Sequence, residues 1–335
     1  AMWNGRLGVE FDAFYNYIFD ILGSNSGKPA SMGGYYPTYV NNNAQDVRGI
    51  DVRLTHRNHI GKDFQYGVTV NLTWAKDRWL RYQDSPNTPD YAKRIGKSRY
   101  MTMGFIADGL FQSEEEIDRS PWISGSRPRV GDIKYKDVNG DGVITDDDQV
   151  PLFAYSGVPQ FMYGFGAEVR YKNWTLNVLF KGTGNNYFLY GGKDGSKFDG
   201  YIPFNQGYKG NVLTLAYDPA NRWTSAEYSG NKATENPHAR FPRLSYGNNA
   251  NNTKPSTFWK GNARYLRLQE LSLNYNLRTP GLRKALGLQS IDFQVMCENL
   301  AVWDGVDIFD PEQAMDTGHA YPIPRRFSLQ IYLNF

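Results

Sequence analysis

Apolar and polar residues alternate along eight segments of the chain. In one of them, Phe64, Val68 and Trp74 occupy even positions, while Gln65 and Asn71 occupy odd positions. Successive side chains of a β-strand point to opposite faces, so this period of two predicts strands with one apolar and one polar face. The eight predicted strands lie within residues 5–15, 50–55, 64–74, 161–171, 174–181, 271–277, 291–298 and 327–335.

The alternation changes phase once, just before the sixth predicted strand. Leu266 and Leu268 occupy even positions, whereas Leu271 and Leu273 occupy odd positions. A shift of one residue exchanges the two faces of a strand. We therefore expect a β-bulge near residues 269–270, or the end of the buried stretch there.

Long and short segments alternate between the predicted strands. In order, the connections are 21–46, 58–63, 83–159, 172–173, 183–262, 278–289 and 304–325. Outer-membrane barrels have short turns on one side of the membrane and long loops on the other. The pattern therefore predicts an all-β fold, a transmembrane antiparallel β-barrel, with 83–159 and 183–262 as long extracellular loops. A soluble all-β module is the alternative.

The composition agrees with strands and restricts the class of function. The chain has 24 Tyr, 19 Phe, 8 Trp and 34 Gly, which suit half-buried strands and turns. Its 37 Lys and Arg nearly balance 34 Asp and Glu, which excludes a nucleic-acid binder that relies on net charge. The mean hydropathy of −0.59 and the lack of a long apolar run exclude transmembrane helices, but not the strands of a barrel.

The cysteine count restricts the possible disulfides and metal sites, and the first residues bear on processing of the chain. Cys297 is the single cysteine, so an intrachain disulfide and a cysteine-built zinc site are excluded. No signal peptide precedes the first predicted strand. We therefore expect a processed product or a fragment of a longer protein.

The last predicted strand and the two long loops contain candidate functional residues. The final strand ends on an aromatic residue and is expected to take part in barrel assembly through Phe327, Leu329, Ile331, Leu333 and Phe335. The long loops contain aromatic residues that could stack on sugar rings or bind a partner, namely Trp122, Tyr155, Trp223, Tyr228 and Trp259. The alternative is that these rings pack the loops against each other.

The segment 137–148 matches a calcium loop of the EF-hand kind. Oxygen ligands at Asp137, Asn139 and Asp141, a glycine at the sixth position, the carbonyl of Val143 and the carboxylate of Asp148 follow the spacing that Ca²⁺ requires. Asp replaces the usual Glu at the last position, and the flanking residues predict loop and strand instead of helices. Structural Ca²⁺ is therefore one interpretation, and an Asp/Asn/Gly turn whose side chains cap their own backbone is the other.

Other kinds of site find no support in the sequence. The four histidines lack the spacing of metal ligands, and no glycine-rich phosphate loop or Ser or Cys nucleophile motif is present. Carboxylates such as Glu10 and Glu168 alternate with Arg6 and Arg170, which indicates a polar barrel lumen more than an acid/base pair. We expect neither an enzyme nor an organic cofactor.

Several motifs together resemble one family. The stretch Gly131–Asp137 followed by Asn139–Gly142 resembles the signature of SusC-type TonB-dependent transporters, which are outer-membrane nutrient importers of Bacteroidetes. The remaining matching segments, in the order of the family, are 107–117, 257–259, 264–268, 321–322 and 327–335.

The resemblance implies a role that the residues alone do not. Such transporters have about 22 strands and a plugged lumen, so this chain would supply the last eight strands, without the plug and the segment that contacts TonB. Their partner is a surface lipoprotein of the SusD type, and the pair captures oligosaccharides or peptides. The alternative functions are a secreted, calcium-stabilised module that binds glycans and, with no paired-carboxylate cleft to support it, a glycoside hydrolase.

Overall fold

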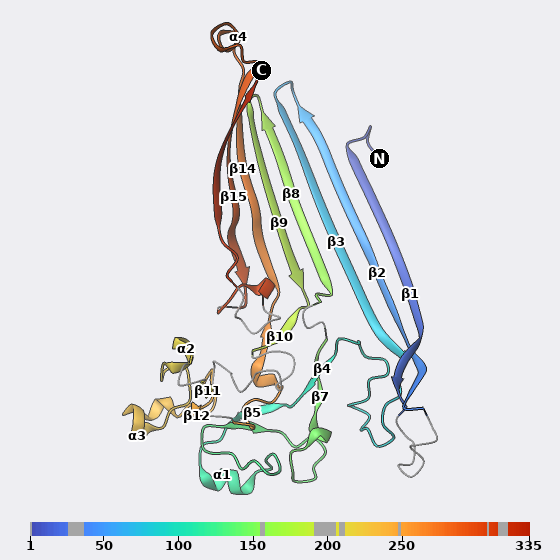
Figure 1. Ribbon diagram of the computed structural model, residues 1–335, viewed down its shortest axis with the longest axis vertical. Coiled ribbons are helices and arrows are strands. Elements are labelled where there is room, and N and C mark those ends of the chain that lie inside the picture. The colour runs from blue at the N-terminus through green and yellow to red at the C-terminus, as the bar shows by residue number, and fades with distance from the viewer. Residues whose placement is uncertain are drawn as a thin grey trace.

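Eight long strands form one antiparallel sheet in the computed structural model (Figure 1). The structure describes residues 2–25, 37–154, 158–190, 206–207, 212–246, 249–306, 308–313 and 321–335. Neighbouring strands pair in the order β1-β2-β3-β8-β9-β14-β15-β16. The bounds are β1 Leu7–Ser24, β2 Tyr39–Ile60, β3 Phe64–Arg81, β8 Phe161–Tyr171, β9 Trp174–Gly184, β14 Tyr265–Leu277, β15 Ser290–Asp304 and β16 Arg326–Asn334.

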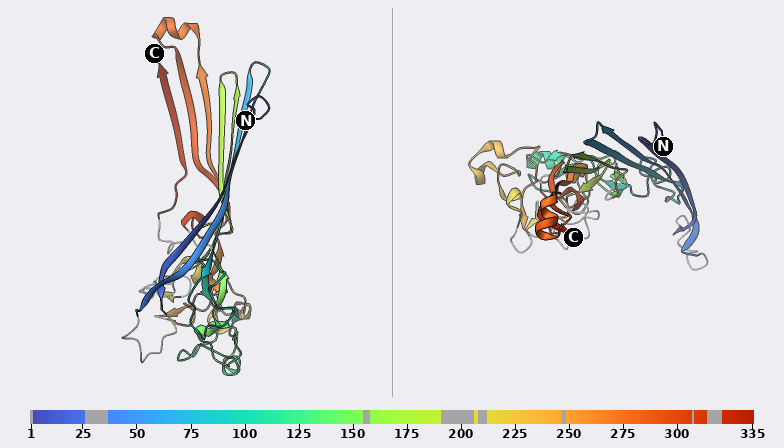
Figure 2. Two further views of the ribbon diagram at one scale, coloured as in Figure 1. Left: turned by 90° about the vertical axis from the view of Figure 1, so that its right-hand side faces the viewer. Right: turned by 90° about the horizontal axis from the view of Figure 1, so that it is seen from above.

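This arrangement confirms the predicted all-β architecture of eight antiparallel strands. The short connections all lie at one end of the sheet and the long ones at the other (Figure 1). Within the described residues the sheet is open, with β1 and β16 as its edges, and Figure 2 shows it strongly twisted. No helix in the described ranges is long and apolar enough to cross a membrane.

The predicted change of phase is a β-bulge. Leu268 pairs with Phe180 of β9 and Glu270 pairs with Leu179, so Gln269 is the extra residue. The same place interrupts the register between β14 and β15. The bulge returns the apolar residues on both sides of it to a single face of the sheet.

The first connection is shorter than its predicted range of 21–46. β1 continues to Ser24 and β2 begins at Tyr39, because backbone pairing persists where the alternation of side chains does not. A register shift between Ile18 and Ile21 surrounds Asp20, whose φ is +53°. Alternation reports which face of a strand is buried, so it misses a paired segment in which apolar and polar residues do not alternate, such as Asn41, Asn42 and Asn43 of β2.

The long connections form a separate body at one end of the sheet, and they are built from short elements. Its strands are β4 Thr102–Gly104, β5 Ala107–Leu110, β6 Ile133–Tyr135, β7 Val150–Phe153, β10 Tyr187–Leu189, β11 Gln206–Gly207, β12 Ser245–Tyr246 and β13 Lys260–Asn262. Its helices are α1 Glu114–Arg119, α2 Thr214–Tyr217 and α3 Ala226–Ser229, with 3₁₀ turns at Asp146–Asp148, Lys232–Thr234, Thr257–Trp259 and Pro311–Gln313. The helix α4, Pro280–Leu286, lies at the opposite end, between β14 and β15 (Figure 1).

Candidate functional site

The apolar face of the sheet has an aromatic row at each end. At the end with the short turns, the register aligns Phe64, Tyr171, Trp174, Tyr275 and Phe293 across five strands, which we call the turn-side aromatic row. The ring centroids of Trp174 and Tyr275 are 4.6 Å apart. These rings mark one boundary of the apolar face.

The second boundary lies toward the long connections. Trp74 of β3 is opposite Phe161 of β8, with ring centroids 6.5 Å apart, and Trp303 of β15 contacts Phe180 on the same face. We call Trp74, Phe161 and Trp303 the loop-side aromatic row. Trp303 is 54% exposed, and apolar residues between the rows, such as Leu273 and Val295, are also exposed. The whole face therefore lacks a covering layer from the described chain.

The distance between the rows suits a bilayer. Ten residues separate Phe64 from Trp74 on β3, which is about 33 Å along a strand that rises roughly 3.3 Å per residue. Tilted by the roughly 40° usual for barrel strands, this length spans about 25 Å, the height of the apolar band of outer-membrane barrels. Aromatic girdles at both edges of such a band are a feature of the same class of protein.

The opposite face of the sheet is polar. Arg53 and Glu10 face each other with 3.8 Å between Nη1 and Oε2, and Asn177 donates a hydrogen bond to Ser272 at 3.3 Å. A hollow of about 1060 Å³ lies over this face near the short turns, and Arg57 and Glu168 are among the residues that line it. One face of the sheet is thus suited to lipid and the other to water or to further protein.

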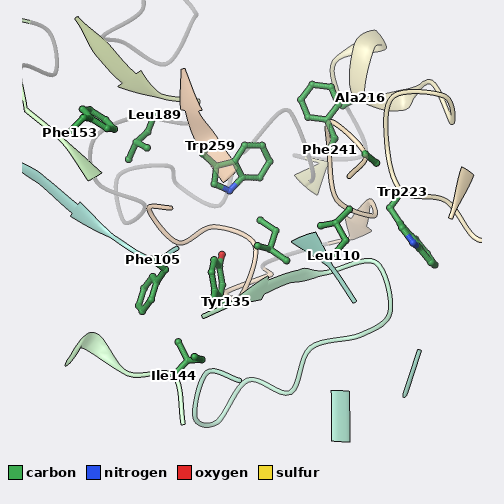
Figure 3. Close-up of a cluster of buried hydrophobic side chains, with 12 residues drawn as sticks. Phe105, Leu110, Tyr135, Ile144, Phe153, Leu189, Ala216, Trp223, Phe241 and Trp259 are labelled. Atoms are coloured by element: carbon green, nitrogen blue, oxygen red, sulfur yellow. The ribbon is translucent and has the colours of Figure 1, made fainter. Parts of the chain in front are cut away.

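The two longest connections share one hydrophobic core (Figure 3). Phe105, Tyr135 and Ile144 from the first connection pack in the same cluster as Trp223 and Trp259 from the second. The backbones also meet, since Phe105 and Ser256 form a parallel bridge. The connections therefore form one folded body, here called the loop body.

A buried polar junction connects the two halves of the loop body. Asp132 is 2% exposed and contacts Arg243 with 2.7 Å between Oδ1 and Nε. Its carboxylate also accepts hydrogen bonds from the side chains of Asn249 and Asn252, at 3.0 and 2.9 Å. Asp132 belongs to the motif that carries the family resemblance, so this part of the motif has a structural function.

Tyr135 extends the same junction. Its hydroxyl donates to the carbonyl of Asn251 at 2.7 Å, and burial raises the pKa of this hydroxyl. The indole nitrogen of Trp259 donates to the carbonyl of Asn252 at 2.8 Å. Polar groups that are buried in this way are stabilising because each finds a partner.

A second buried network attaches the connection between β15 and β16 to the sheet. The guanidinium of Arg267 on β14, 2% exposed, contacts both carboxylate oxygens of Asp310 at 2.6 and 2.7 Å and Glu312 at 2.8 Å. Glu312 also contacts Lys181 of β9 at 2.9 Å. This network was not predicted from the sequence, because its members come from three separate segments and have no spacing motif.

The acidic loop 137–148 is closed by its own hydrogen bonds. Asp148 is fully buried and accepts from the backbone N–H groups of Val138 and Thr145 at 2.7 and 2.8 Å. Asp137 accepts from Gly140 and Gly142 at 2.6 and 2.8 Å, and the hydrogen bond from Gly142 lowers the pKa of the Asp137 carboxyl.

These contacts correspond to the turn in which side chains cap their own backbone. The donor set of Asp137, Asn139, Asp141, Val143 and Asp148 is all oxygen, which suits Ca²⁺. Across the described ranges, however, no group of three or more His, Cys, Asp or Glu is arranged to hold a metal ion. Calcium binding by this loop stays a prediction.

The five candidate aromatic residues of the loops differ in how deeply they are buried. Trp223 and Trp259 are 7% and 4% exposed within the core, so packing is the alternative that describes them. Tyr228 is 70% exposed on α3, and Trp122 is half-buried beside Ile144. Tyr155 lies outside the described residues. A contact of Tyr228 or Trp122 with substrate stays a prediction.

The last strand presents its apolar residues on the uncovered face. Phe327, Leu329, Ile331 and Leu333 are all more than half exposed, as is Phe335 just beyond β16. β16 pairs with β15 through residues 326–334, and its other edge has no partner among the described residues. A role of these residues in barrel assembly remains a prediction.

Comparison with known proteins finds relatives along the whole chain. The chain is 26% identical over 363 residues to TonB-dependent receptor P26 of Formosa agariphila, covering 100% of this chain and 33% of that receptor. It is 22% identical over 366 residues to TonB-dependent receptor P3 of the same organism, again with 100% and 33% coverage. No family model matches the chain. The chain spans about a third of the length of these relatives.

Solved structures share the fold. The RagAB peptide importer in the open-open state matches 99% of this chain and 33% of its own, with a TM-score of 0.66 and 18% identity. A structure of the RagAB peptide transporter matches 99% and 34%, with a TM-score of 0.66 and 20% identity. At these identities the likeness concerns the arrangement of the strands and loops.

Proposed function

Because the chain is part of a SusC-like TonB-dependent transporter, we propose that its sheet is a section of an outer-membrane β-barrel that imports nutrients. The observation that carries the proposal is the uncovered apolar face with an aromatic row at each end, about 25 Å apart after tilt. A soluble module would expose this face to water, and soluble proteins rarely expose so large a continuous apolar surface.

The polar face then lines the lumen, and the loop body lies on the outside of the cell. The hollow over Arg57 and Glu168 is suited to receive another part of the transporter that is not in this chain, such as a plug. Contact with TonB would also belong to that part. This chain has a transport role in the proposal and no catalytic step.

The substrate class in this proposal is oligosaccharides or peptides, captured together with a SusD-like surface lipoprotein. The name of the RagAB peptide importer supports peptides for a protein with the same arrangement of strands. Exposed rings of the loop body, such as Tyr228, are suited to contact either kind of substrate. Co-purification of a surface lipoprotein with the full-length transporter is the direct measurement of the partnership.

The membrane position can be tested by cysteine labelling of the full-length protein. In a background with Cys297→Ala, we expect cysteines at Leu329 and Ile331 to be protected from a water-soluble maleimide in outer-membrane vesicles. Cysteines at Tyr228 and Glu227 in the loop body are the accessible controls, since both side chains are exposed. Labelling at Leu329 and Ile331 as rapid as at the controls would reject the membrane wall.

A further inference from the structure

A pair of uncompensated cations lies directly beyond the loop-side aromatic row, on the same face as its rings. Trp74 is opposite Ile50, and two residues farther along the strands Lys76 is opposite Arg48. Both of these cationic side chains are exposed. Since alternate residues of a strand share a face, Arg48 and Lys76 point the same way as Trp74, away from the lumen.

The local charge at this position is unbalanced. Residues directly opposite on antiparallel strands have side chains roughly 5 Å apart at their first carbon, and like charges there are destabilising. Tyr15, the other neighbour of Arg48, carries no compensating charge. Within the described chain neither cation forms an ion pair of 4.0 Å or less. An anion between the two side chains would remove the repulsion.

A carboxylate two residues farther along the same face is already used by a third cation. Asp46, fully buried, accepts hydrogen bonds from Arg78 at 3.1 Å from Nε and 3.1 Å from Nη2. Arg78 and Asp46 are opposite each other, two residues beyond the Lys76 and Arg48 pair. Asp46 therefore neutralises Arg78 and leaves the charge of the other two cations available.

The position of the cation pair relative to the apolar band indicates which anion it could bind. If the loop-side aromatic row marks the edge of the apolar band, the cation pair lies two residues beyond that edge, about 7 Å along the strand toward the loop body. This is the level of lipid headgroups in the leaflet on the side of the loop body. We propose that Arg48 and Lys76 form a binding site for the phosphate of an outer-leaflet lipid headgroup. The inference rests on the proposed membrane position, and it adds a specific lipid site to it.

The site faces the bilayer and not the lumen, which separates it from the substrate pathway. A substrate that crosses inside the barrel would meet the opposite face of β2 and β3, where Arg53 and Asn71 lie. Each basic residue near an anionic membrane surface contributes an affinity factor of roughly fivefold. Removal of both charges is therefore expected to weaken lipid binding by about 25-fold.

Native mass spectrometry of the full-length transporter in detergent can measure this. The protein would be titrated with a bisphosphorylated glycolipid of the lipid A type, with the same lipid after removal of its phosphates, and with inorganic phosphate. We expect the wild-type protein to prefer the phosphorylated lipid. The double variant Arg48→Gln with Lys76→Gln should lose about 25-fold in affinity for it, and high salt should reduce the difference.

The matched control removes two exposed cations from the short turns at the other end of the sheet. Lys62 and Lys172 lie in the short turns beside β3 and β8, and Lys62→Gln with Lys172→Gln makes the same change in net charge. This control should bind the phosphorylated lipid within about twofold of the wild type, because its charges lie far from the proposed headgroup level.

Three outcomes would overturn the lipid site. They are equal binding of the phosphorylated and dephosphorylated lipids, unchanged affinity of the Arg48 and Lys76 double variant, and full competition by millimolar inorganic phosphate, which would indicate a site for free phosphate. Loss of a co-purifying protein with lipid binding intact would assign the cations to that protein. The heat-modifiable folding of the wild type on gels, measured in parallel, tests the barrel itself, so failure of the membrane proposal is recognised separately.

Discussion

Gly131 lies against the indole of Trp223 so closely that a methyl group on it would be 2.3 Å from Cε3 of that ring. Gly131 also has a φ of +87°, which residues other than glycine rarely adopt. Gly131 directly precedes the buried Asp132, and Trp223 belongs to the core of the loop body. Glycine is therefore required here for two independent reasons.

We expect Gly131→Ala to destabilise the loop body by about 2–4 kcal/mol, the sum of an unfavourable backbone conformation and an overpacked core. Hydrogen exchange of the full-length protein would detect faster exchange around Ile133 and Phe241. Gly125→Ala is the control, because Gly125 has a φ of +77° but a methyl group on it would meet no other atom within 4 Å. Equal exchange in both variants would show that the contact with Trp223 is unimportant.

Removal of the Arg267 guanidinium should release the connection between β15 and β16. Arg267→Met leaves the carboxylates of Asp310 and Glu312 near each other without their shared cation. The expected loss is about 3–5 kcal/mol, typical of a buried ion pair with one partner removed. Urea unfolding of the full-length protein in micelles, with hydrogen exchange of residues 308–313, measures both effects.

The control for this variant is Arg326→Met. Arg326 contacts Glu298 at 3.0 Å, but its side chain is 66% exposed. Exposed pairs of this kind contribute at most about 1 kcal/mol. A loss at Arg267 that is no larger than the loss at Arg326 would contradict the importance of the buried network.

Calcium binding by residues 137–148 is tested with Asp141→Ala. If the loop binds Ca²⁺, the variant should bind it more weakly, and proteolysis of residues 83–159 should become faster, as it should when a chelator is added to the wild type. Asp146→Ala is the control, because position ten of such a loop is not among its ligands. Identical digestion of the wild type with and without chelator would favour the turn that caps itself.

Deletion of Phe335 should impair assembly of the proposed barrel. The ring is 78% exposed beyond the end of β16, on the apolar face that the final strand presents. An edge strand must find a partner to close the sheet, and Phe335→Leu, which keeps an apolar side chain, is the control. The amount of folded protein in outer membranes measures the effect, and normal levels of the deletion variant would exclude the role.

The sheet was predictable because both of its faces have a simple environment. Apolar and polar residues alternate over β3 and β8, so the strands, their order and the bulge at Gln269 follow from the sequence. The far ends of β1 and β2 were missed. There, Ile18 and Phe19 of β1 are apolar on both faces, whereas Asn41, Asn42 and Asn43 of β2 are polar on both faces. Only backbone pairing continues the strands in these segments.

The loop body was not predictable in the same way. Its polar junction joins Asp132 to Arg243, which are 111 residues apart. An Asp and an Arg separated by this distance in the sequence form no recognisable motif. The burial of Trp223 and Trp259 also depends on how two connections fold together. Local spacing identified residues 137–148 as an acidic loop, but it could not decide between a metal ion and the backbone as the partner of its carboxylates.

The bulge at Gln269 makes the length of β14 more important than the identity of many of its residues. Because of this one extra residue, Arg267 shares the polar face of the sheet with Lys181, while Leu268 shares the apolar face with Phe180. A deletion of Gln269 would reverse both, turning a guanidinium toward the apolar face and a leucine toward two carboxylates. An apolar residue on the apolar face of β14 can therefore be replaced by another apolar residue. An insertion or deletion at Gln269, in contrast, would have to be matched by a second one farther along the same strand.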